Sequence, residues 1–151
     1  MDPESARALF ATARVARLAS VGEDGAPHLV PIVFALDGDL LYSAVDHKPK
    51  RTRRLRRLAN IAAHPRVSVL ADHYEADWTR LWWARADGVG RVVEAGVGVE
   101  FERAVAALVA RYEQYAGQPP AGPAIVIEIE RWSGWSAAGE VAFRSYSGAG
   151  G

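Results

Sequence analysis

The sequence predicts an α+β protein built on an antiparallel β-barrel of six to seven strands, with two or three helices inserted between them. Short apolar segments recur along the chain between turns rich in Gly, Pro and Asp, as in antiparallel sheets. Two longer segments, residues 50–63 and 98–115, instead repeat apolar residues at helical spacing. We see no internal repeat and no linker, so we expect one domain over residues 1–144 and a disordered tail over 145–151.

The N-terminal residues predict a helix followed by two strands. Asp2 suits the N-cap position and Pro3 the first helical position. Residues 14–21 and 28–36 carry the β-branched and apolar residues of strands. Pro31 has no backbone N–H to donate to a ladder, so the second strand should lie at a sheet edge or contain a bulge.

The middle of the chain predicts a strand, a helix and a second strand. An Asp37-Gly38 turn leads into the apolar strand 40–45. The helix over residues 50–63 should end before His64-Pro65, because the residue that precedes a proline is disfavoured in the helical conformation. Residues 66–71 then alternate apolar and polar, which is typical of a half-buried strand.

The remaining elements complete the barrel, and closing the sheet would remove its exposed edges. In chain order we expect an acidic loop at 72–77, strands at 81–86 and 89–94 with a bend at Asp87-Gly88, a helix at 98–115, a loop at 118–123, and a strand at 124–130 extended by Trp132 and Trp135. Trp78, Trp132 and Trp135 are interpreted as packing residues.

Composition narrows the possible functions. The chain has no cysteine, which excludes disulfides, thiolate metal sites and cysteine nucleophiles. Its four histidines lack the spacing of a metal site, and no nucleophile–base pair is evident. No segment reaches the roughly 18 apolar residues of a membrane span, and the acidic N-terminus lacks the apolar core of a signal peptide. We therefore expect a cytoplasmic protein without a membrane partner.

A cluster of positive charge follows the apolar strand 40–45. The cations are Lys48, Lys50, Arg51, Arg53, Arg54, Arg56 and Arg57, and no acidic residue occurs between His47 and Ala71 although the whole chain is neutral. An anionic ligand would relieve this self-repulsion, and the amides of the helix start near Thr52 would also favour an anion. A solvated arginine-rich helix face is the alternative. Nucleic acid is a weaker third interpretation, because of the overall neutrality and the acidic loop 72–77.

Several motifs occur in a characteristic order. A strand containing Tyr42-Ser43 precedes the basic segment, Asn-x-x-x-His-Pro-Arg-Val follows at 60–67, and Trp-Trp-x-Arg-x-x-Gly follows at 82–88. The series resembles the split β-barrel flavoproteins of the pyridoxamine-phosphate-oxidase-like, FMN-binding type. Within them it is most similar to the actinobacterial branch that uses the deazaflavin coenzyme F420.

The resemblance implies a homodimeric oxidoreductase with two cofactor sites at the subunit interface, passing hydride between reduced F420 and an unidentified small organic acceptor. Arg57 stands where the family has its phosphate-binding lysine, and Trp83 stands where flavin-binding relatives often carry Gln. No protein residue is assigned a catalytic role, because in hydride transfer the cofactor carries the chemistry. The implied cofactor-binding residues are Tyr42, Ser43, Lys48, Lys50, Arg51, Thr52, Arg56, Arg57, Trp83 and Arg85.

Two alternatives stay open at this point. One is an FMN-dependent enzyme of the same fold. The other is a non-catalytic protein that binds or carries F420 or haem.

Overall fold

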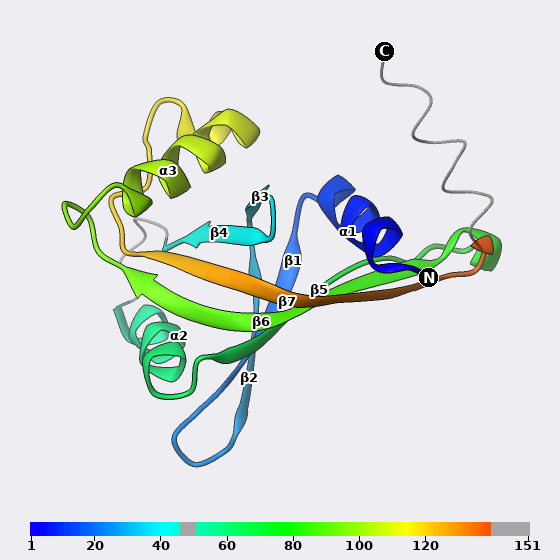
Figure 1. Ribbon diagram of the computed structural model, residues 1–151, viewed down its shortest axis with the longest axis horizontal. Helices are drawn as coiled ribbons and strands as arrows, with labels where there is room; N and C mark the ends of the chain where they lie inside the picture. The colour runs from blue at the N-terminus through cyan, green and yellow to red at the C-terminus, as the bar shows by residue number, and fades with distance from the viewer. Residues whose placement is uncertain (46–50, 140–151) are drawn as a thin grey trace.

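The computed structural model describes residues 1–45 and 51–139, except for the side chains of residues 51–55. Seven strands form one sheet in the order β2-β1-β5-β6-β7-β4-β3, and every neighbouring pair is antiparallel. This confirms the predicted α+β split-barrel architecture (Figure 1). The elements are α1 (Pro3–Thr12), β1 (Ala16–Val21), β2 (Pro27–Ile32), β3 (Ala35–Asp37), β4 (Leu40–Ala44), α2 (Arg51–Ala63), β5 (Arg66–His73), η1 (Trp78–Arg80), β6 (Trp82–Val93), α3 (Glu100–Arg111), η2 (Glu113–Tyr115) and β7 (Ala124–Ser136).

Helix α1 begins as the sequence predicts and covers part of the sheet. The Asp2 carboxylate accepts a hydrogen bond from the Ser5 backbone N–H at 2.9 Å, and Pro3 occupies the first turn. Phe10 is fully buried and packs against Phe34, with ring centroids 4.8 Å apart, and against Trp132 at 5.2 Å. The packing role expected for Trp132 is therefore confirmed.

The other two tryptophans expected to pack are exposed. Trp78 lies in η1 with 75% of its surface accessible, and Trp135 near the end of β7 is 44% accessible. Both occur beyond the covered part of the sheet, in the loop that connects β5 to β6 and at the far end of β7. The packing prediction is wrong for these two residues within the described chain.

The strand predicted over residues 28–36 is divided into β2 and β3. The break falls at Val33 and Phe34, where the Phe34 N–H bonds the Tyr112 hydroxyl at 3.1 Å instead of a neighbouring strand. Strand β2 is an edge strand paired only with β1, so the edge position predicted from Pro31 is confirmed. The sheet retains β2 and β3 as its two ends, so the described strands do not form a fully closed barrel.

The two strands predicted over residues 81–94 are one continuous strand. Asp87 and Gly88 do not bend the chain back; they mark a register shift, where β7 carries one extra residue, Glu130. The backbones approach closely there, because a Cβ atom placed on Gly88 would lie 2.1 Å from the Glu128 carbonyl oxygen. The resulting β6–β7 ladder runs the length of the molecule (Figure 1).

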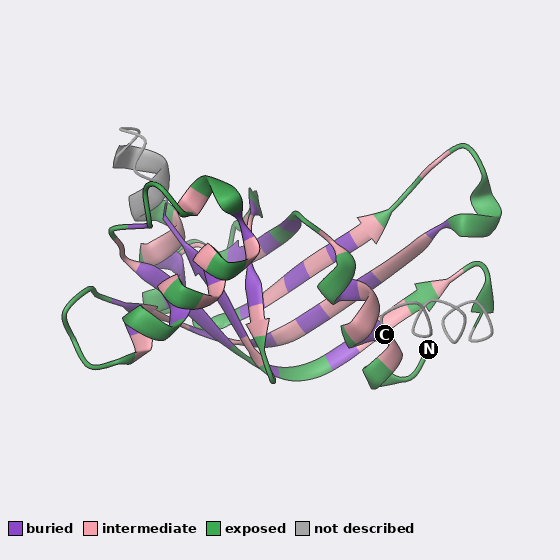
Figure 2. Cartoon of the chain, turned by 90° about the horizontal axis from the view of Figure 1, so that it is seen from above, coloured by how far each residue is buried: buried purple, intermediate pink, exposed green. Residues whose placement is uncertain are grey.

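The sheet is buried on both faces at its β4–β7 end. Residues 124–127 of β7 are fully inaccessible, as the continuous apolar run suggests. Val126 packs with Phe101 of α3, whereas Ile127 belongs to the main core together with Ile61 of α2. Elsewhere burial alternates along the strands, which Figure 2 shows as purple bands.

The end of α3 joins three segments that are distant in sequence. The Tyr112 hydroxyl accepts the Phe34 N–H and lies within donating distance of the carbonyl oxygens of Arg14 (3.0 Å) and Phe34 (2.9 Å). Arg111 donates to the carbonyl oxygens of Ala11 (3.0 Å) and Ala13 at the C-terminal end of α1, where positive charge is favoured. This contact ties α3 to α1 and to the break between β2 and β3.

Replacing Gly88 with Ala should destabilise the protein. The new methyl group would overlap the Glu128 carbonyl, so the two longest strands must separate, and we expect a loss of at least about 2 kcal/mol in the free energy of unfolding. Urea denaturation measures this loss. Gly117→Ala is the matched control, because nothing lies within 4 Å of its Cβ position. Equal stabilities of the two variants would contradict the close approach.

Replacing Tyr112 with Phe should cost about 1–3 kcal/mol, because the buried Phe34 N–H loses its partner while the ring packing is kept. Thermal and urea unfolding measure the change. Tyr74→Phe, at an exposed site, removes the same atom and should leave stability unchanged within about 0.5 kcal/mol. A Tyr112→Phe variant with the stability of the wild type would show that the hydroxyl does not join these segments.

Candidate functional site

Four predicted contacts of the basic segment cannot be placed by their side chains. Lys48 and Lys50 lie outside the described residues. Arg51 and Thr52 form the first turn of α2, and only their backbone is described. Their binding roles stay predictions from the sequence.

Two arginines in the described part of the basic segment lie near enough to His28 of strand β2 to affect its protonation. Arg56 is exposed and Arg57 is half-buried on α2, and both guanidinium groups act on the imidazole of His28. Burial is the main cause that lowers the pKa of His28, and repulsion by Arg56 and Arg57 lowers it further. His28 Nδ1 is buried and has no hydrogen-bond partner among the described residues. We call His28, Arg56 and Arg57 the anion cluster, because together they offer nitrogen donors to a negatively charged group.

His28 was not predicted as a site residue, because residues 29–32 are all apolar or proline and give no alternation that shows which face is covered. Along β2, residues 28, 30 and 32 are less exposed than residues 27, 29 and 31, so the strand alternation places His28 on the covered face with Val30 and Ile32. Which helix covers that face could not be inferred from the alternation. The decisive fact is tertiary, namely that α2 packs over this end of the sheet.

Two contacts position α2 there. The Asn60 side chain donates to the Ser20 hydroxyl on β1 at 3.2 Å, and both side chains are buried. Ile61 is buried in the main core, and its Cγ2 would lie 3.2 Å from a Cβ atom on Gly90 of β6. Asn60 of the Asn-x-x-x-His-Pro motif thus fixes the helix that carries Arg56 and Arg57.

Tyr42 and Ser43 are neighbours on strand β4. Each is 1% accessible. Tyr42 packs between β4 and α3, and burial raises the pKa of its hydroxyl, with smaller contributions from Asp37 and Glu100. The Ser43 hydroxyl donates to the Val33 carbonyl at 2.8 Å. Both side chains are therefore buried in this chain, and their place beside the cofactor ring stays a prediction from the resemblance.

Trp83 and Arg85 lie together on β6. The Arg85 guanidinium carbon is 5.7 Å from the centre of the Trp83 ring, and Arg85 Nε donates to the Asp87 carboxylate at 3.1 Å. Asp87 also accepts a hydrogen bond from the Ser68 hydroxyl. The pair therefore forms an ordered polar and aromatic patch on the face of β6 opposite to the buried residues Ala84 and Ala86.

The predicted site residues with described side chains lie on three elements, α2, β4 and β6, and those of α2 are far from those of β6. Gly90 marks the point where α2 meets β6, because Gly90 N–H bonds the Pro65 carbonyl at 2.7 Å just after α2 ends. Trp83 is seven residues earlier on the same strand, which corresponds to about 23 Å at about 3.3 Å per residue. Figure 1 shows α2 at one end of β6 and the start of β6 at the other.

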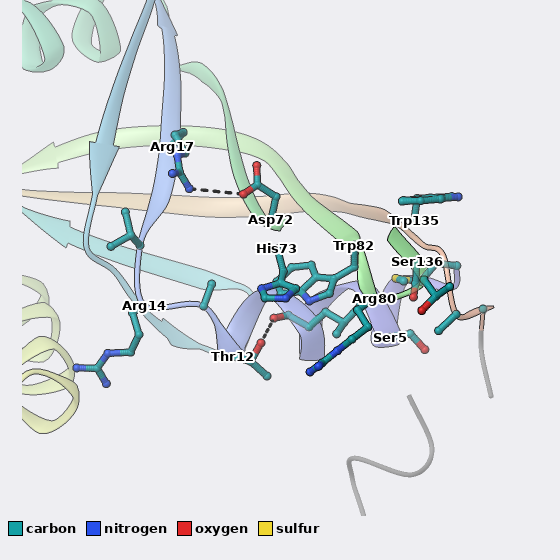
Figure 3. A pocket seen from close by; sticks show the side chains of 17 residues that line it. Ser5, Thr12, Arg14, Arg17, Asp72, His73, Arg80, Trp82, Trp135 and Ser136 are labelled. Carbon is teal, nitrogen blue, oxygen red and sulfur yellow. Dashed lines mark hydrogen bonds and ion pairs between the residues drawn. The ribbon is translucent and has the colours of Figure 1, made fainter. Parts of the chain in front are cut away.

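A cavity of about 810 Å³ opens at that other end, and none of the predicted site residues lines it. It lies between the junction of α1 with β1 and the adjoining ends of β5 and β6 (Figure 3). Within the described ranges, no group of three His, Asp or Glu side chains could hold a metal ion. None of the helices in the described part of the chain has the length and hydropathy needed to cross a bilayer.

Solved structures with the same fold include proteins of several kinds. A conserved hypothetical protein from Mycobacterium tuberculosis, Rv2991, is 20% identical, with 91% of this chain and 86% of that chain covered and a TM-score of 0.71. A FAD-binding protein from Mesorhizobium loti is 23% identical (89% and 94% covered, TM-score 0.67). The haem storage protein HutZ from Vibrio cholerae is 20% identical (90% and 95% covered, TM-score 0.66).

At these identities the structural matches show the fold alone. No curated protein sequence matches the chain significantly. The family is shown instead by its sequence profile, which matches residues 2–136, nearly all of the described chain. The protein belongs to the pyridoxamine 5'-phosphate oxidase family.

Proposed function

We propose that this protein is an oxidoreductase that binds reduced coenzyme F420 and passes hydride to a small organic acceptor. The observation that carries the proposal is the anion cluster, in which His28 Nδ1 lacks a partner among the described residues beside two arginines. Arg56 and Arg57 of this cluster belong to the basic segment 48–57, which contains no acidic residue. Membership of a family of cofactor-binding oxidases supports the same class of chemistry.

The donor set fits an anionic coenzyme. Guanidinium groups bind phosphate through paired hydrogen bonds, and a neutral imidazole with a free nitrogen can add one more contact. Arg56, Arg57 and His28 would hold the phosphate. Lys48 and Lys50 would contact the phosphate or the glutamate tail, and the helix start at Arg51 and Thr52 would favour the phosphate. Seven cations exceed what the single phosphate of FMN requires, which favours the deazaflavin.

The cofactor supplies the chemistry, since a bound deazaflavin moves two electrons as hydride and reacts poorly with oxygen. The protein has to hold the ring and leave one face open for the acceptor. Trp83 and Arg85 would border the ring if they came from a second copy, because in their own chain they lie about 23 Å and about 17 Å along β6 from Gly90, where α2 meets the strand. The proposal therefore includes a homodimer, and the cytoplasmic location stays a prediction.

A second candidate is a flavin or haem protein of the same fold, with or without turnover. Two of the similar structures are a FAD-binding protein and a haem storage protein, which is the observation that favours this candidate. The absorption spectrum of protein purified from a host that makes all three cofactors separates the cases. Deazaflavin gives a violet-edge band, flavin gives two bands, and haem gives a Soret band.

Replacing Arg56 and Arg57 together with Ala should weaken F420 binding by more than tenfold, at least about 1.4 kcal/mol, because the phosphate loses both guanidinium partners. Isothermal titration calorimetry of the full chain measures the affinity. The Arg7→Ala, Arg103→Ala double variant removes the same charge from exposed positions on α1 and α3 and should bind as the wild type does. Unchanged affinity after the loss of Arg56 and Arg57 would remove them from the site.

Titration of His28 should report the bound anion. In the free protein its pKa lies below the ordinary value of about 6.5, because burial and both arginines disfavour the charged ring. The unfolded chain takes up this proton at higher pH, so protonation of His28 lowers stability as the pH falls below about 6.5. A bound phosphate stabilises the imidazolium, so coenzyme binding should raise the pKa and tighten as the pH falls.

Proton NMR of the His28 ring, assigned with a His28→Gln variant, measures this pKa with and without coenzyme. In the free Arg56→Ala, Arg57→Ala variant the pKa should rise but stay below the ordinary value, because burial is the larger cause. A His28 resonance that does not respond to saturating coenzyme would place the anion elsewhere.

A further inference from the structure

We propose that the cavity at the far end of β6 is a second ligand site, which binds a small aromatic carboxylate. Its volume of about 810 Å³ lies within the range of roughly 300–1,000 Å³ found for small-molecule pockets. It lies at the opposite end of β6 from α2 and the anion cluster (Figures 1 and 3). The inference is independent of the proposed coenzyme function.

The cavity exists because two paired strands separate. The β1–β5 ladder ends at the Arg17–Leu70 pair, while β5 continues to His73 in register with β6. The chain before Arg17 turns away into α1. Residues 71–73 therefore have no strand partner on the β1 side within the described chain. Asp72 and His73 line the cavity, so unpaired strand backbone borders it next to their side chains.

One wall of the cavity is apolar and partly aromatic. Leu9 and Ala13 of α1 and Trp82 of β6 contribute to this wall, and Val15 is 43% exposed beside them. Trp82 lies directly across the β5–β6 ladder from His73, so the two rings are neighbours on one face. Figure 3 shows both side chains at the cavity, with Arg80 close by. A flat aromatic ring fits this wall, since aromatic rings pack well against each other in offset or edge arrangements.

The rim of the cavity is positively charged. Arg14, Arg17 and Arg80 line it, whereas Asp72 is the one carboxylate among the lining residues that the structure describes. Arg17 Nη1 lies 3.8 Å from Asp72 Oδ1, at the long limit of an ion pair, and Arg80 Nε lies 3.7 Å from Glu75. Exposed ion pairs of this kind contribute about 0–1 kcal/mol. A ligand carboxylate can therefore compete for these guanidinium groups.

The apolar wall and the positively charged rim together indicate which class of ligand the cavity binds. The aromatic and aliphatic wall favours a planar apolar body, and the arginine rim favours one negative charge at its edge. A neutral aromatic molecule would use only the wall, and an aliphatic anion only the rim. The combination points to a compound with one or two fused rings and a carboxylate.

Calorimetric titration of the full chain with 2-naphthoate tests the site, with uncharged 2-naphthamide as the comparison ligand. We expect saturable binding of the carboxylate, at least fivefold weaker binding of the amide, and at least a tenfold loss of naphthoate affinity in the Arg17→Gln, Arg80→Gln variant. Both arginines are exposed, so the variant should fold, which its thermal unfolding curve checks. Arg66→Gln is the control, because its exposed ion pair with Glu130, at 3.3 Å, lies away from the cavity.

Naphthoate should bind equally well to protein saturated with F420, since the cavity is at the opposite end of β6 from the anion cluster, and its Trp82 wall is on the opposite face of β6 from Trp83 and Arg85. The proposal is overturned if naphthoate shows no saturable binding at millimolar concentration, or if the amide binds as well as the acid. It is also overturned if the Arg17→Gln, Arg80→Gln variant binds as the wild type does, or if F420 displaces naphthoate. None of these readings depends on whether F420 supports turnover.

Discussion

The close antiparallel pairing of β6 with β7 is the constraint on which the rest of the structure depends. The two strands are 12 and 13 residues long and reach roughly 40 Å at about 3.3 Å per residue. They can lie together over this length because Gly88 has no side chain where the Glu128 carbonyl passes, and because Glu130 is accommodated as an extra residue. Helices α2 and α3 pack near one end of the ladder, and α1 packs near the other (Figure 1).

This length keeps two chemical environments apart. At one end, Asn60 and Ile61 hold α2 so that Arg56 and Arg57 face His28. At the other end, the separation of β1 from β5 leaves a cavity with an aromatic wall and an arginine rim. Within the described part of one chain, the anion cluster and the aromatic cavity are therefore separate. In the proposed homodimer, the second copy would bring Trp83 and Arg85 to the cofactor.

Most of the fold could be predicted because its signals are local. The Asp2-Pro3 start of α1, the proline that confines β2 to an edge, and the fully apolar run at 124–127 act within a few residues of the elements they define. The features of the fold that were not predicted depend on residues that are distant in the sequence. The break between β2 and β3 depends on the Tyr112 hydroxyl, which comes from 78 residues further along the chain. An Asp-Gly pair that commonly forms a turn instead lies at a register shift, because β7 supplies the opposing backbone.

The candidate site, too, could be predicted only where its signals are local in the sequence. The cations could be identified without a structure, because their number and the absence of acidic residues among them are properties of the sequence. That His28 lies near those cations could not be predicted, because it depends on the packing of α2 against β6 and against β1, the neighbour of β2. The family resemblance implied that Tyr42 borders the cofactor ring, and in this chain α3 packs against Tyr42. Burial by a helix that comes later in the chain cannot be inferred from strand alternation.

The central claim is that the basic segment and the anion cluster bind a deazaflavin coenzyme in preference to a flavin. Isothermal titration calorimetry of the purified, cofactor-free protein tests this claim most directly. F420 and FMN are titrated separately at the same salt concentration. The account predicts that F420 binds at least tenfold more tightly than FMN, because its glutamate tail engages cations that FMN cannot reach. Equal affinities, or tighter binding of FMN, would contradict it.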